Sequence, residues 1–566
     1  MPRVGFCLIF CFLLAWAQEA PATVDTSKTA VIEGIVVNEL TKEPIRKAEI
    51  SLYKQGKSGD VVGRGPNAAY SAVTDPSGKF RIENIDPGDY ALNHRKAGFV
   101  TTRANYGLST RILKLAAGQS LTGLRYSLQP QAILTGRVLD DEGDPVQGVP
   151  VALLRYRFFR GSYHLTSNMR PQQTNDRGEF RFIDLQPGRY YLQADAQRFT
   201  GMPGSAPPVP SAAPGELRTA FVATYYPNAT EIAQATRIEV QAGQELAGRD
   251  IGLRKEKVVR VSGKVLDMNG APAKQAFVSL VHQDASMGGF SGVVAPMDEN
   301  GVFAANNVPP GQYTVRAMKG DGSTWQSGET SITIGDNGLK DVVVQIQPAL
   351  EAKGQIVLEG SDRKDFDFSG IQLVVQPVNE ASFNTGFGDS KSDGTITVSQ
   401  LSPGRYTLDV FNLRSSGSYV KTILAGTEEV FGKEVDANAL VAGGVKIVLR
   451  LDAASITGSV EVPEERKAFL RFPSVVLVPA DAQLRKSDQR NIAQLDQDNG
   501  YSLKNIRPGD YIAFAFEEYD YASLQDPESF AILASKGTAV SLAAGESKSL
   551  ALKILPWPEQ FADRIQ

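Results

Sequence analysis

The sequence contains only two cysteines, Cys7 and Cys11, and both lie near the N-terminus. If the first 17 residues are removed, the mature chain has no cysteine, which excludes disulfides and thiol catalysis. Small exported domains usually supplement a thin hydrophobic core with disulfides. The folding units of this chain should therefore hold about 100 residues each, enough to be stable through apolar burial alone.

Histidine is almost as scarce, since the chain has only His94, His164 and His282. A zinc carboxypeptidase site needs a histidine and a glutamate close together, with a second histidine downstream. None of the three histidines has a glutamate three residues on, and each falls in a different part of the chain. No G-x-S-x-G stretch precedes a helical pattern either. We therefore expect no enzyme activity, no metal and no other cofactor.

Charge of either sign is not in large excess, because 59 lysines and arginines oppose 63 aspartates and glutamates, for a formal net charge of −4. Nucleic-acid binding domains usually carry a basic patch or stripe. The chain should not bind nucleic acid.

Long apolar runs are also lacking, apart from "VGFCLIFCFLLAW" at residues 4–16. This run is too short to span a bilayer, which needs about 20 apolar residues. One basic residue precedes it and an A-x-A pattern follows it, so residues 1–17 are predicted to be a signal peptide. The cleavage residues are Ala15, Ala17 and Gln18. We expect an exported protein, periplasmic or extracellular, without a transmembrane anchor.

What the sequence does contain is a repeat. The stretch "DPSGKFRIENIDPGDYAL", which begins at Asp75, returns as "NDRGEFRFIDLQPGRYYL" from Asn175. Further copies begin at Asp298, Lys391 and Gln497. Apolar residues alternate with polar ones ahead of each Pro-Gly pair, which is typical of a half-buried β-strand.

Each Pro-Gly pair is followed by a tyrosine three residues after the proline. The pair fits the central positions of a type II turn, in which glycine supplies the positive φ. We expect the tyrosine to open the next strand on its buried side, with its hydroxyl reaching back to a backbone group. The corner residues are Pro87, Gly88, Tyr90, Pro187, Gly188, Tyr190, Pro310, Gly311, Tyr313, Pro403, Gly404, Tyr406, Pro508, Gly509 and Tyr511.

A second constant element is a Gly-x-Val or Gly-x-Ile step, which begins at Gly34, Gly136, Gly263, Gly354 and Gly458. It precedes its corner by a nearly constant interval, and each copy ends with another alternating strand. Short strands, turn signals and little helical periodicity predict an all-β fold, a tandem array of five antiparallel β-sandwich modules.

The predicted division of the chain has eight parts. Short connections between modules favour a semi-rigid rod. The ranges are a signal peptide at 1–17, an N-terminal linker at 18–29, module 1 at 30–130, module 2 at 131–256 with a proline-rich insertion at 201–216, module 3 at 257–348, module 4 at 349–452, module 5 at 453–556 and a C-terminal tail at 557–566.

The stretch "GRVLDDEGDPVQGVPVALL" at 136–154, followed by the second copy of the corner, resembles the carboxypeptidase regulatory-like domain. "GKVLDMNGAPAKQAFVSLV" and "GIVVNELTKEPIRKAEISLY" resemble it nearly as well, and modules 4 and 5 do so more weakly. The resemblance implies a prealbumin-type sandwich, similar to Ig-like and starch-binding sandwiches, that occurs as a noncatalytic part of exported bacterial proteins.

Acidic turns such as "DDEGD" at 140–144 resemble fragments of calcium loops but lack the twelve-residue ligand spacing. Aspartate and asparagine at the start of a turn usually bond to their own backbone, and a following glycine takes the left-handed conformation. The pattern therefore favours plain hairpin turns.

One stretch, "RYRFFRGSYH" at 155–164, combines aromatic and basic residues. Exposed rings stack on sugars, and arginines donate to hydroxyls or carboxylates. The alternative, which the pattern favours, is an extended hairpin covered by the insertion at 201–216. The candidate binding residues are Arg155, Tyr156, Arg157, Phe158, Phe159, Arg160 and Tyr163.

Three classes of function remain open: a noncatalytic scaffold or binding protein, a carbohydrate-binding protein of the cell envelope, and an accessory to an exported hydrolase or metallopeptidase. The first fits the repeats best. The expected partner is a glycan or an envelope protein.

Overall fold

The computed structural model describes most of the chain after the predicted signal peptide, whose cleavage residues Ala15, Ala17 and Gln18 lie outside the described residues. So do Arg160 and the insertion at 201–216. The described residues are 28–54, 69–100, 112–159, 162–167, 169–196, 218–282, 292–320, 325–361, 363, 365–378, 385–413, 417–467, 470, 473–486 and 491–558.

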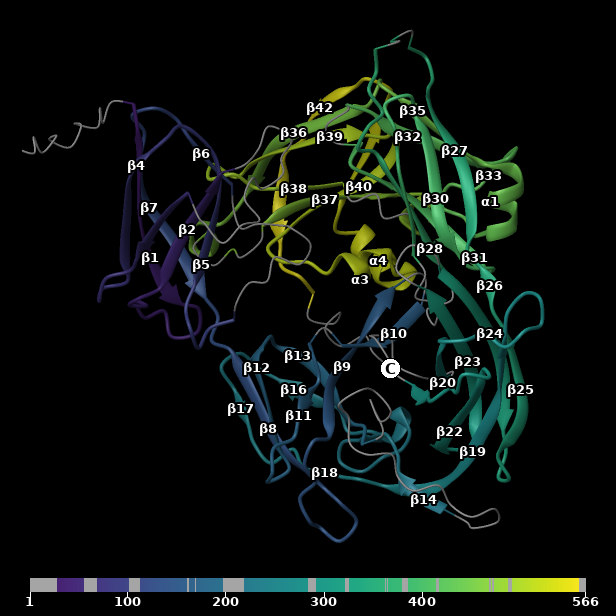
Figure 1. Ribbon diagram of the computed structural model, residues 1–566. Helices are drawn as coiled ribbons and strands as arrows, with labels where there is room; N and C mark the ends of the chain where they lie inside the picture. Colours follow the sequence, from purple (N-terminus) through teal and green to yellow (C-terminus); the bar gives the residue numbers. More distant parts are fainter. Residues whose placement is uncertain are drawn as a thin grey trace, which may run out of the picture.

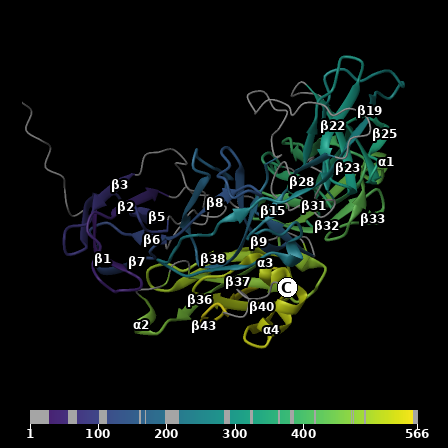
Figure 2. The ribbon, with the colours of Figure 1, turned by 90° about the horizontal axis from the view of Figure 1, so that it is seen from below.

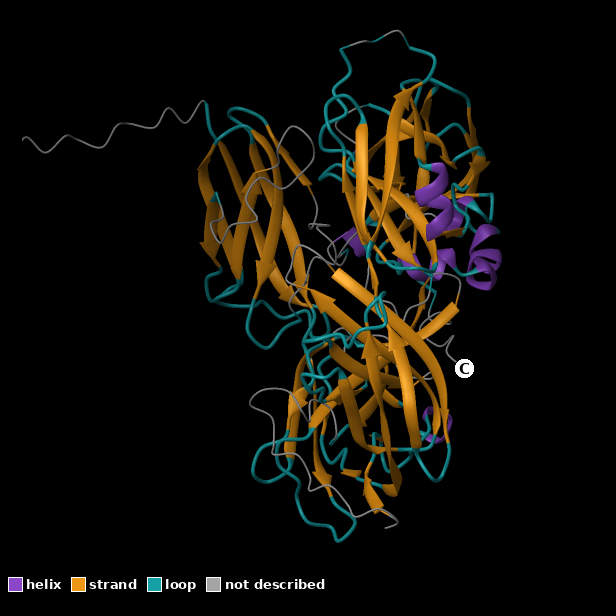
Figure 3. Ribbon diagram, turned by 45° about the vertical axis from the view of Figure 1, so that its right-hand side comes forward, coloured by secondary structure: helices purple, strands orange, loops and turns teal. Residues whose placement is uncertain are grey.

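The all-β prediction is confirmed, since strands build nearly every described element and helices are few and short (Figure 3). In module 1 the strands form two sheets of order β4-β1-β7 and β3-β2-β5-β6. Their bounds are β1 Ala30–Asn38, β2 Glu49–Lys54, β3 Tyr70–Val73, β4 Lys79–Ile85, β5 Gly88–Arg95, β6 Ile112–Leu115 and β7 Ser120–Leu128.

Module 2 repeats this plan, with β8 taking the place of β1 and β9 that of β2. Its elements are β8 Ala132–Leu139, β9 Pro150–Phe159, β10 Ser162–Thr166, β11 Gln172–Gln173, β12 Glu179–Leu185, β13 Gly188–Ala194, β14 Arg218–Phe221, β15 Thr224–Tyr225, the short 3-10 helix η2 Ile232–Gln234, β16 Ile238–Val240, β17 Glu245–Leu246 and β18 Ile251–Gly252.

Module 3 has a sheet around β19 and a second sheet of order β21-β20-β23-β24-β26. Its strands are β19 Lys255–Leu266, β20 Phe277–His282, β21 Val293–Ala295, β22 Val302–Val308, β23 Gly311–Gly320, β24 Trp325–Ile334, β25 Leu339–Gln345 and β26 Gln347–Pro348.

In module 4 the two sheets join through β29 and β30 into one path. Its elements are β27 Leu350–Leu358, β28 Gln372–Pro377, β29 Gly386–Asp389, β30 Thr395–Leu401, β31 Arg405–Phe411, β32 Tyr419–Ala425, β33 Glu428–Glu429, β34 Val435–Asp436, α1 Ala437–Gly443 and β35 Val445–Arg450.

In module 5 the path β38-β37-β40-β43-β36-β39 is joined through β43, with β41 beside β40 and β42 beside β36. Its elements are β36 Ala454–Glu461, α2 Glu464–Lys467, β37 Ser474–Pro479, the 3-10 helix η4 Leu484–Lys486, β38 Asn491–Gln494, β39 Gly500–Ile506, β40 Gly509–Phe516, α3 Tyr521–Gln525, α4 Pro527–Ala534, β41 Thr538–Leu542, β42 Ser547–Ser549 and β43 Leu552–Leu555.

The first strand of each module lies between an antiparallel and a parallel neighbour. β1 pairs antiparallel with β4 and parallel with the closing strand β7, and the other modules repeat the arrangement. The alternating pattern predicted the closing strands but not their direction. A parallel partner requires a long crossover connection, which here is the rest of the module.

The constant glycine of the first strand allows a close approach of two neighbouring chains. A Cβ added at Gly263 would lie 2.0 Å from the carbonyl oxygen of Val342 in the closing strand and 2.8 Å from the ring of Phe303. The equivalent glycines are as crowded, with the nearest atom at 1.9 to 2.5 Å. The Gly-x-Val step therefore marks the place where the closing strand docks.

The Pro-Gly corners differ from the predicted type II turn. The five glycines have φ between 150° and 153°, whereas the third residue of a type II turn has φ near +80°. The left-handed residue instead lies three positions before the proline, as at Asn84 (φ 58°) and Asp184 (φ 60°). The left-handed residue coincides with a shift of register at the end of the preceding strand, after which the chain passes to the other sheet.

The corner tyrosine does reach back to the backbone. The hydroxyl of Tyr90 donates to the carbonyl of Asp86 at 2.8 Å. The same bond to the residue four positions earlier is made by Tyr190, Tyr406 and Tyr511.

Buried apolar side chains form a separate cluster within each of the five module ranges. The module boundaries stay a prediction, because one strand crosses them: β14, from the range of module 2, pairs antiparallel with β19 of module 3.

The rod-like arrangement is wrong. Figures 1 and 2 show module 5 between module 1 and module 4, with α3 and α4 next to β9 of module 2. Short connections fix the distance between neighbours in the chain but leave their relative direction free, so the array is able to fold back.

Candidate functional site

The predicted binding hairpin is present, because β9 pairs antiparallel with β10. The side chains of Tyr156 and Phe158 pack within the protein, whereas that of Tyr163 is 40% exposed. Phe158 is only 6% exposed, and its ring lies 5.2 Å from that of Tyr163 in an edge-to-face contact. Tyr156 makes a similar contact with Tyr191, at 5.9 Å.

The outer end of the hairpin contacts module 5. The hydroxyl of Tyr163 donates to the Oδ2 atom of Asp526 at 3.0 Å. Asp526 is buried and also caps α4, since the same oxygen accepts from the backbone of Ser529 at 3.0 Å. Module 5 is therefore a neighbour of this hairpin, while the insertion at 201–216 lies outside the described residues, so the covering that the sequence favoured stays a prediction.

The prediction that a sugar stacks on Phe158 is wrong, because the ring is buried and offers no face to a ligand. Arg155 and Arg157 are half-buried, while Arg160 and the side chain of Phe159 lie outside the described residues. Sugar binding by the rest of this set stays a prediction.

The three histidines lie in different modules, as their positions in the sequence indicated. His94 is buried, with its Nε2 atom 3.2 Å from the carbonyl oxygen of Ser127. The ring of His282 lies 5.0 Å from that of Tyr313. His164 is in β10. Within the described residues, no group of three or more His, Cys, Asp or Glu side chains is placed to hold a metal ion.

The acidic turns bond to their own backbone. The Oδ1 atom of Asp140 accepts from the amides of Glu142 and Asp144 at 2.9 and 2.8 Å. Asp75 does the same with Ser77 and Lys79, and these bonds lower the pKa of Asp75. This is the hairpin-turn geometry that the sequence favoured.

The first and last modules are in contact, which the sequence did not predict. The Nζ atom of Lys114 in β6 donates to the Oδ2 atom of Asp496 at 2.9 Å. The side-chain amide of Gln497 accepts from the backbone nitrogen of Lys114 at 3.1 Å and donates to its carbonyl at 3.2 Å. Gln497 thus occupies the position of a neighbouring strand on the edge of the sheet.

Module 5 contacts module 4 through a cation–π pair and a hydrogen bond. The guanidinium of Arg507 lies 5.2 Å from the centre of the Phe431 ring. The Nε2 atom of Gln483 donates to the carbonyl of Phe431 at 3.0 Å.

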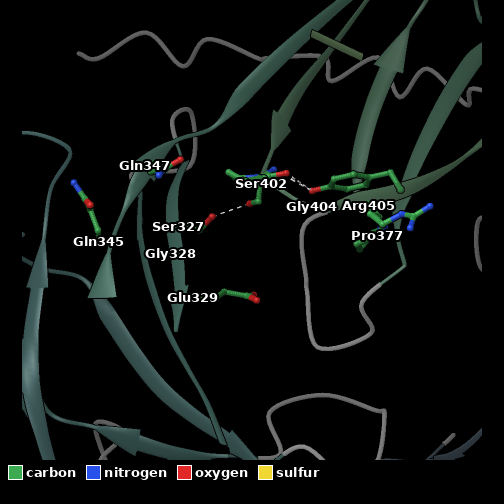
Figure 4. A pocket seen from close by; sticks show the side chains of 11 residues that line it. Ser327, Gly328, Glu329, Gln345, Gln347, Pro377, Ser402, Gly404 and Arg405 are labelled. Carbon is green, nitrogen blue, oxygen red and sulfur yellow. Dashed lines mark hydrogen bonds between the residues drawn. The ribbon is translucent and has the colours of Figure 1, made fainter. Parts of the chain in front are cut away.

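A pocket of about 240 Å³ lies between modules 3 and 4. Figure 4 shows Glu329, from β24, projecting into the space between the modules, and Ser327 meeting Ser402 across their junction. The two hydroxyl oxygens are 2.7 Å apart. Gln345, Gln347, Pro377 and Arg405 are among the other lining residues.

The carboxylate of Glu329 faces a buried cation. Its Oε1 atom lies 3.1 Å from the Nε atom of Arg316, a residue that is 3% exposed. Burial lowers the pKa of Arg316, and the charge of Glu329 acts in the opposite direction. Burial also raises the pKa of Tyr406, with a smaller contribution from Glu329.

Two segments of the chain match a known protein family. Residues 31–126 and 260–347 match the carboxypeptidase regulatory-like domain. These two carboxypeptidase regulatory-like domains correspond to modules 1 and 3. The family match does not include module 2, whose resemblance to this domain is based on the sequence pattern at 136–154.

No curated protein matches the chain. Among solved structures, the Bacillus anthracis TIE protein is 12% identical, over 71% of this chain and 68% of that protein, with a TM-score of 0.15. A streptococcal ancillary pilin is 13% identical, over 56% and 99%, with a TM-score of 0.18. GBS52, a minor pilin of Streptococcus agalactiae, is 15% identical, over 41% and 97%, with a TM-score of 0.21.

None of the helices in the described part of the chain is both long and apolar enough to cross a membrane.

Proposed function

We propose that this protein is a noncatalytic, exported scaffold whose modules are held in a closed arrangement by module 5. The observation that carries the proposal is the set of contacts that module 5 makes with modules 1, 2 and 4. They join segments that are far apart in the sequence, with Lys114 and Asp496 separated by 382 positions.

The chemistry of these contacts supports a fixed architecture. Gln497 satisfies both backbone groups of Lys114 on the exposed edge of a sheet, and an edge strand that is covered in this way is protected from pairing with other chains. Asp526 is buried, and a hydrogen bond to a buried carboxylate is stronger than one in water.

The noncatalytic part of the proposal is supported by the roles of the reactive side chains. His94 and His282 pack against tyrosines, and the aspartates of the acidic turns accept bonds from their own backbone. These groups stabilise the modules rather than face a substrate.

Export is supported by the pattern at residues 1–17. We expect cleavage after Ala17 and a location in the periplasm or outside the cell, with an envelope protein or a glycan as partner. N-terminal sequencing of protein recovered from the exported fraction should begin at Gln18. A sequence that begins at Met1 would contradict this.

Turnover assays distinguish the scaffold from an enzyme. The exported chain is incubated with a panel of peptides that have free C-termini, with added zinc and with a chelator. The expected result is no hydrolysis in either condition. Hydrolysis that the chelator abolishes would overturn the noncatalytic proposal and favour a metallopeptidase.

The alternative function is carbohydrate binding in the cell envelope, and the more remote one is an accessory role to an exported hydrolase. The first alternative is favoured if the chain binds envelope polysaccharide and if Tyr156→Ala abolishes that binding while the fold is kept.

A further inference from the structure

The junction between modules 3 and 4 has the features of a small binding site. We propose that the pocket around Glu329 binds one neutral, polyhydroxylated molecule of the size of a single sugar ring. This inference goes beyond the scaffold function, and it concerns different residues from the hairpin of module 2.

The position and the size of the pocket limit the ligand. Pockets occur preferentially at interfaces between domains, and those that hold drug-sized molecules measure roughly 300–1,000 Å³. The pocket here measures about 240 Å³. It accommodates one small ring, or the terminal unit of a chain, rather than a longer oligomer.

The lining groups determine the chemical class. A carboxylate only accepts hydrogen bonds, whereas serine hydroxyls and glutamine amides both donate and accept. The pocket places Glu329 beside Ser327, Ser402 and Gln347, whereas the side-chain amide of Gln345 donates to the carbonyl of Asp267 at 3.4 Å. Hydroxyl groups of a ligand also donate and accept, so a molecule that carries several of them suits such a mixed lining.

The charges favour a neutral ligand. The carboxylate of Glu329 is already balanced by the buried guanidinium of Arg316, so a cation is not needed to compensate it. An anion would meet the charge of Glu329 at short range. The guanidinium of Arg405 is paired with Glu434, with the Nε and Oε2 atoms 3.2 Å apart.

The site is also held in place before a ligand binds. Arg316 fixes one oxygen of Glu329, and a carboxylate has about four lone-pair positions, so acceptor capacity remains for a ligand. The backbone of Ser402 is fixed by Tyr406, whose hydroxyl accepts from its nitrogen at 3.0 Å and donates to its carbonyl at 2.8 Å. Such preorganisation reduces the entropy that binding loses.

The experiment uses the full chain and four probes: glucose, galactose, mannose and N-acetylglucosamine. Saturation-transfer NMR and calorimetry measure binding to the parent and to Glu329→Gln, which removes the charge but keeps the shape. We expect saturable binding of at least one probe, weakened by about tenfold or more in Glu329→Gln, because a hydrogen bond to a charged group contributes about 1.5–3 kcal/mol.

Two further variants keep the test decisive. Gln347→Ala changes an exposed side chain of the lining and leaves the Arg316 pair intact, so it decides the question if Glu329→Gln does not fold. Glu299→Gln, an exposed glutamate of the same module outside the pocket, is the matched control and should bind as the parent does. Circular dichroism checks the fold of each.

The proposal is overturned if none of the four sugars binds the parent, or if folded Glu329→Gln and Gln347→Ala bind as the parent does. Binding that is lost in Tyr156→Ala but kept in both pocket variants would also overturn it, and would place the site on the hairpin of module 2. Because these readouts do not involve peptide hydrolysis or module closure, their failure is separate from that of the scaffold function.

Discussion

Single glycines decide where the closing strand of each module docks. The carbonyl of Val342 and the ring of Phe303 leave no space for a side chain at Gly263. A left-handed turn glycine lies nine residues before the corner proline in modules 1 to 4, and in module 5 asparagine takes that position, where Asn499 has φ 61°. Asparagine adopts this conformation more readily than most residues.

We predict that Gly263→Ala destabilises module 3 by about 1–3 kcal/mol, which is typical of overpacking in a core. Hydrogen exchange of peptides from β19 and β25 measures the loss as a lower free energy of local opening. The matched control is Gly335→Ala in the same module, where an added Cβ finds no atom within 4 Å. Equal exchange in the two variants would contradict the close-approach explanation.

We predict that the protein loses stability in alkali because its corner tyrosines are buried. Burial raises the pKa of Tyr90, Tyr313 and Tyr511 to about 12, from an ordinary value of 10.0. Below pH 10 both the folded and the unfolded chain keep these phenols neutral, so their contribution is complete. As the pH rises from about 10 to about 12, the unfolded chain releases these protons first and stability falls.

Ultraviolet titration of tyrosinate, followed together with circular dichroism, measures this effect. The corner tyrosines should ionise only above pH 10, together with unfolding. Ionisation of all tyrosines in one step near pH 10 with the fold intact would show that the corners are not buried.

At the scale of elements, the sequence predicted the strands around each corner because period-two alternation is a local pattern. It did not reveal the turn type, since φ at Asn84 and at Gly88 depends on how the chain passes from β4 in one sheet to β5 in the other. It also missed α4, although Asp526, Pro527 and Glu528 form a recognisable helix start. The apolar strands β37 and β40, buried on both faces, were a second signal that helices cover their outer face.

The hairpin of module 2 should be stabilised by module 5. We predict that Tyr163→Phe and Asp526→Asn each lower the free energy of local opening of β9 and β10 by about 1 kcal/mol, the usual contribution of one hydrogen bond. Asparagine caps helices about as well as aspartate, so α4 should remain formed. Hydrogen exchange of peptides from β9 and β10 measures the effect of each variant, and exchange of α4 peptides checks that the helix remains formed.

The double variant completes a thermodynamic cycle. Tyr163→Phe removes the bond, and Asp526→Asn removes the charge of its acceptor, so both changes act on one interaction and their combined effect should be smaller than the sum of the two single effects. Strict additivity would mean that Tyr163 and Asp526 do not interact in solution.

At the scale of the whole molecule, closure of the array could not be predicted from the sequence. Lys114 lies between the apolar residues Leu113 and Leu115, and Asp496 and Gln497 lie in an acidic turn. Nothing local to either stretch identifies its partner. The pocket between modules 3 and 4 has the same origin, since Ser327 and Ser402 come together only when two modules pack. The sequence therefore predicts the modules, while the surfaces between them require the structure.

A cross-linking measurement tests closure most directly. Because the chain has only two cysteines, introduced cysteines are the only reactive thiols once these two are replaced. Asp89 and Asp498 are both exposed, and both charges act on Lys114. A chain that carries Asp89→Cys and Asp498→Cys, with Cys7→Ser and Cys11→Ser, is treated with a short bismaleimide at low protein concentration. We predict that mass spectrometry finds positions 89 and 498 linked within single chains. The absence of this link, or links only between different chains, would contradict the closed arrangement.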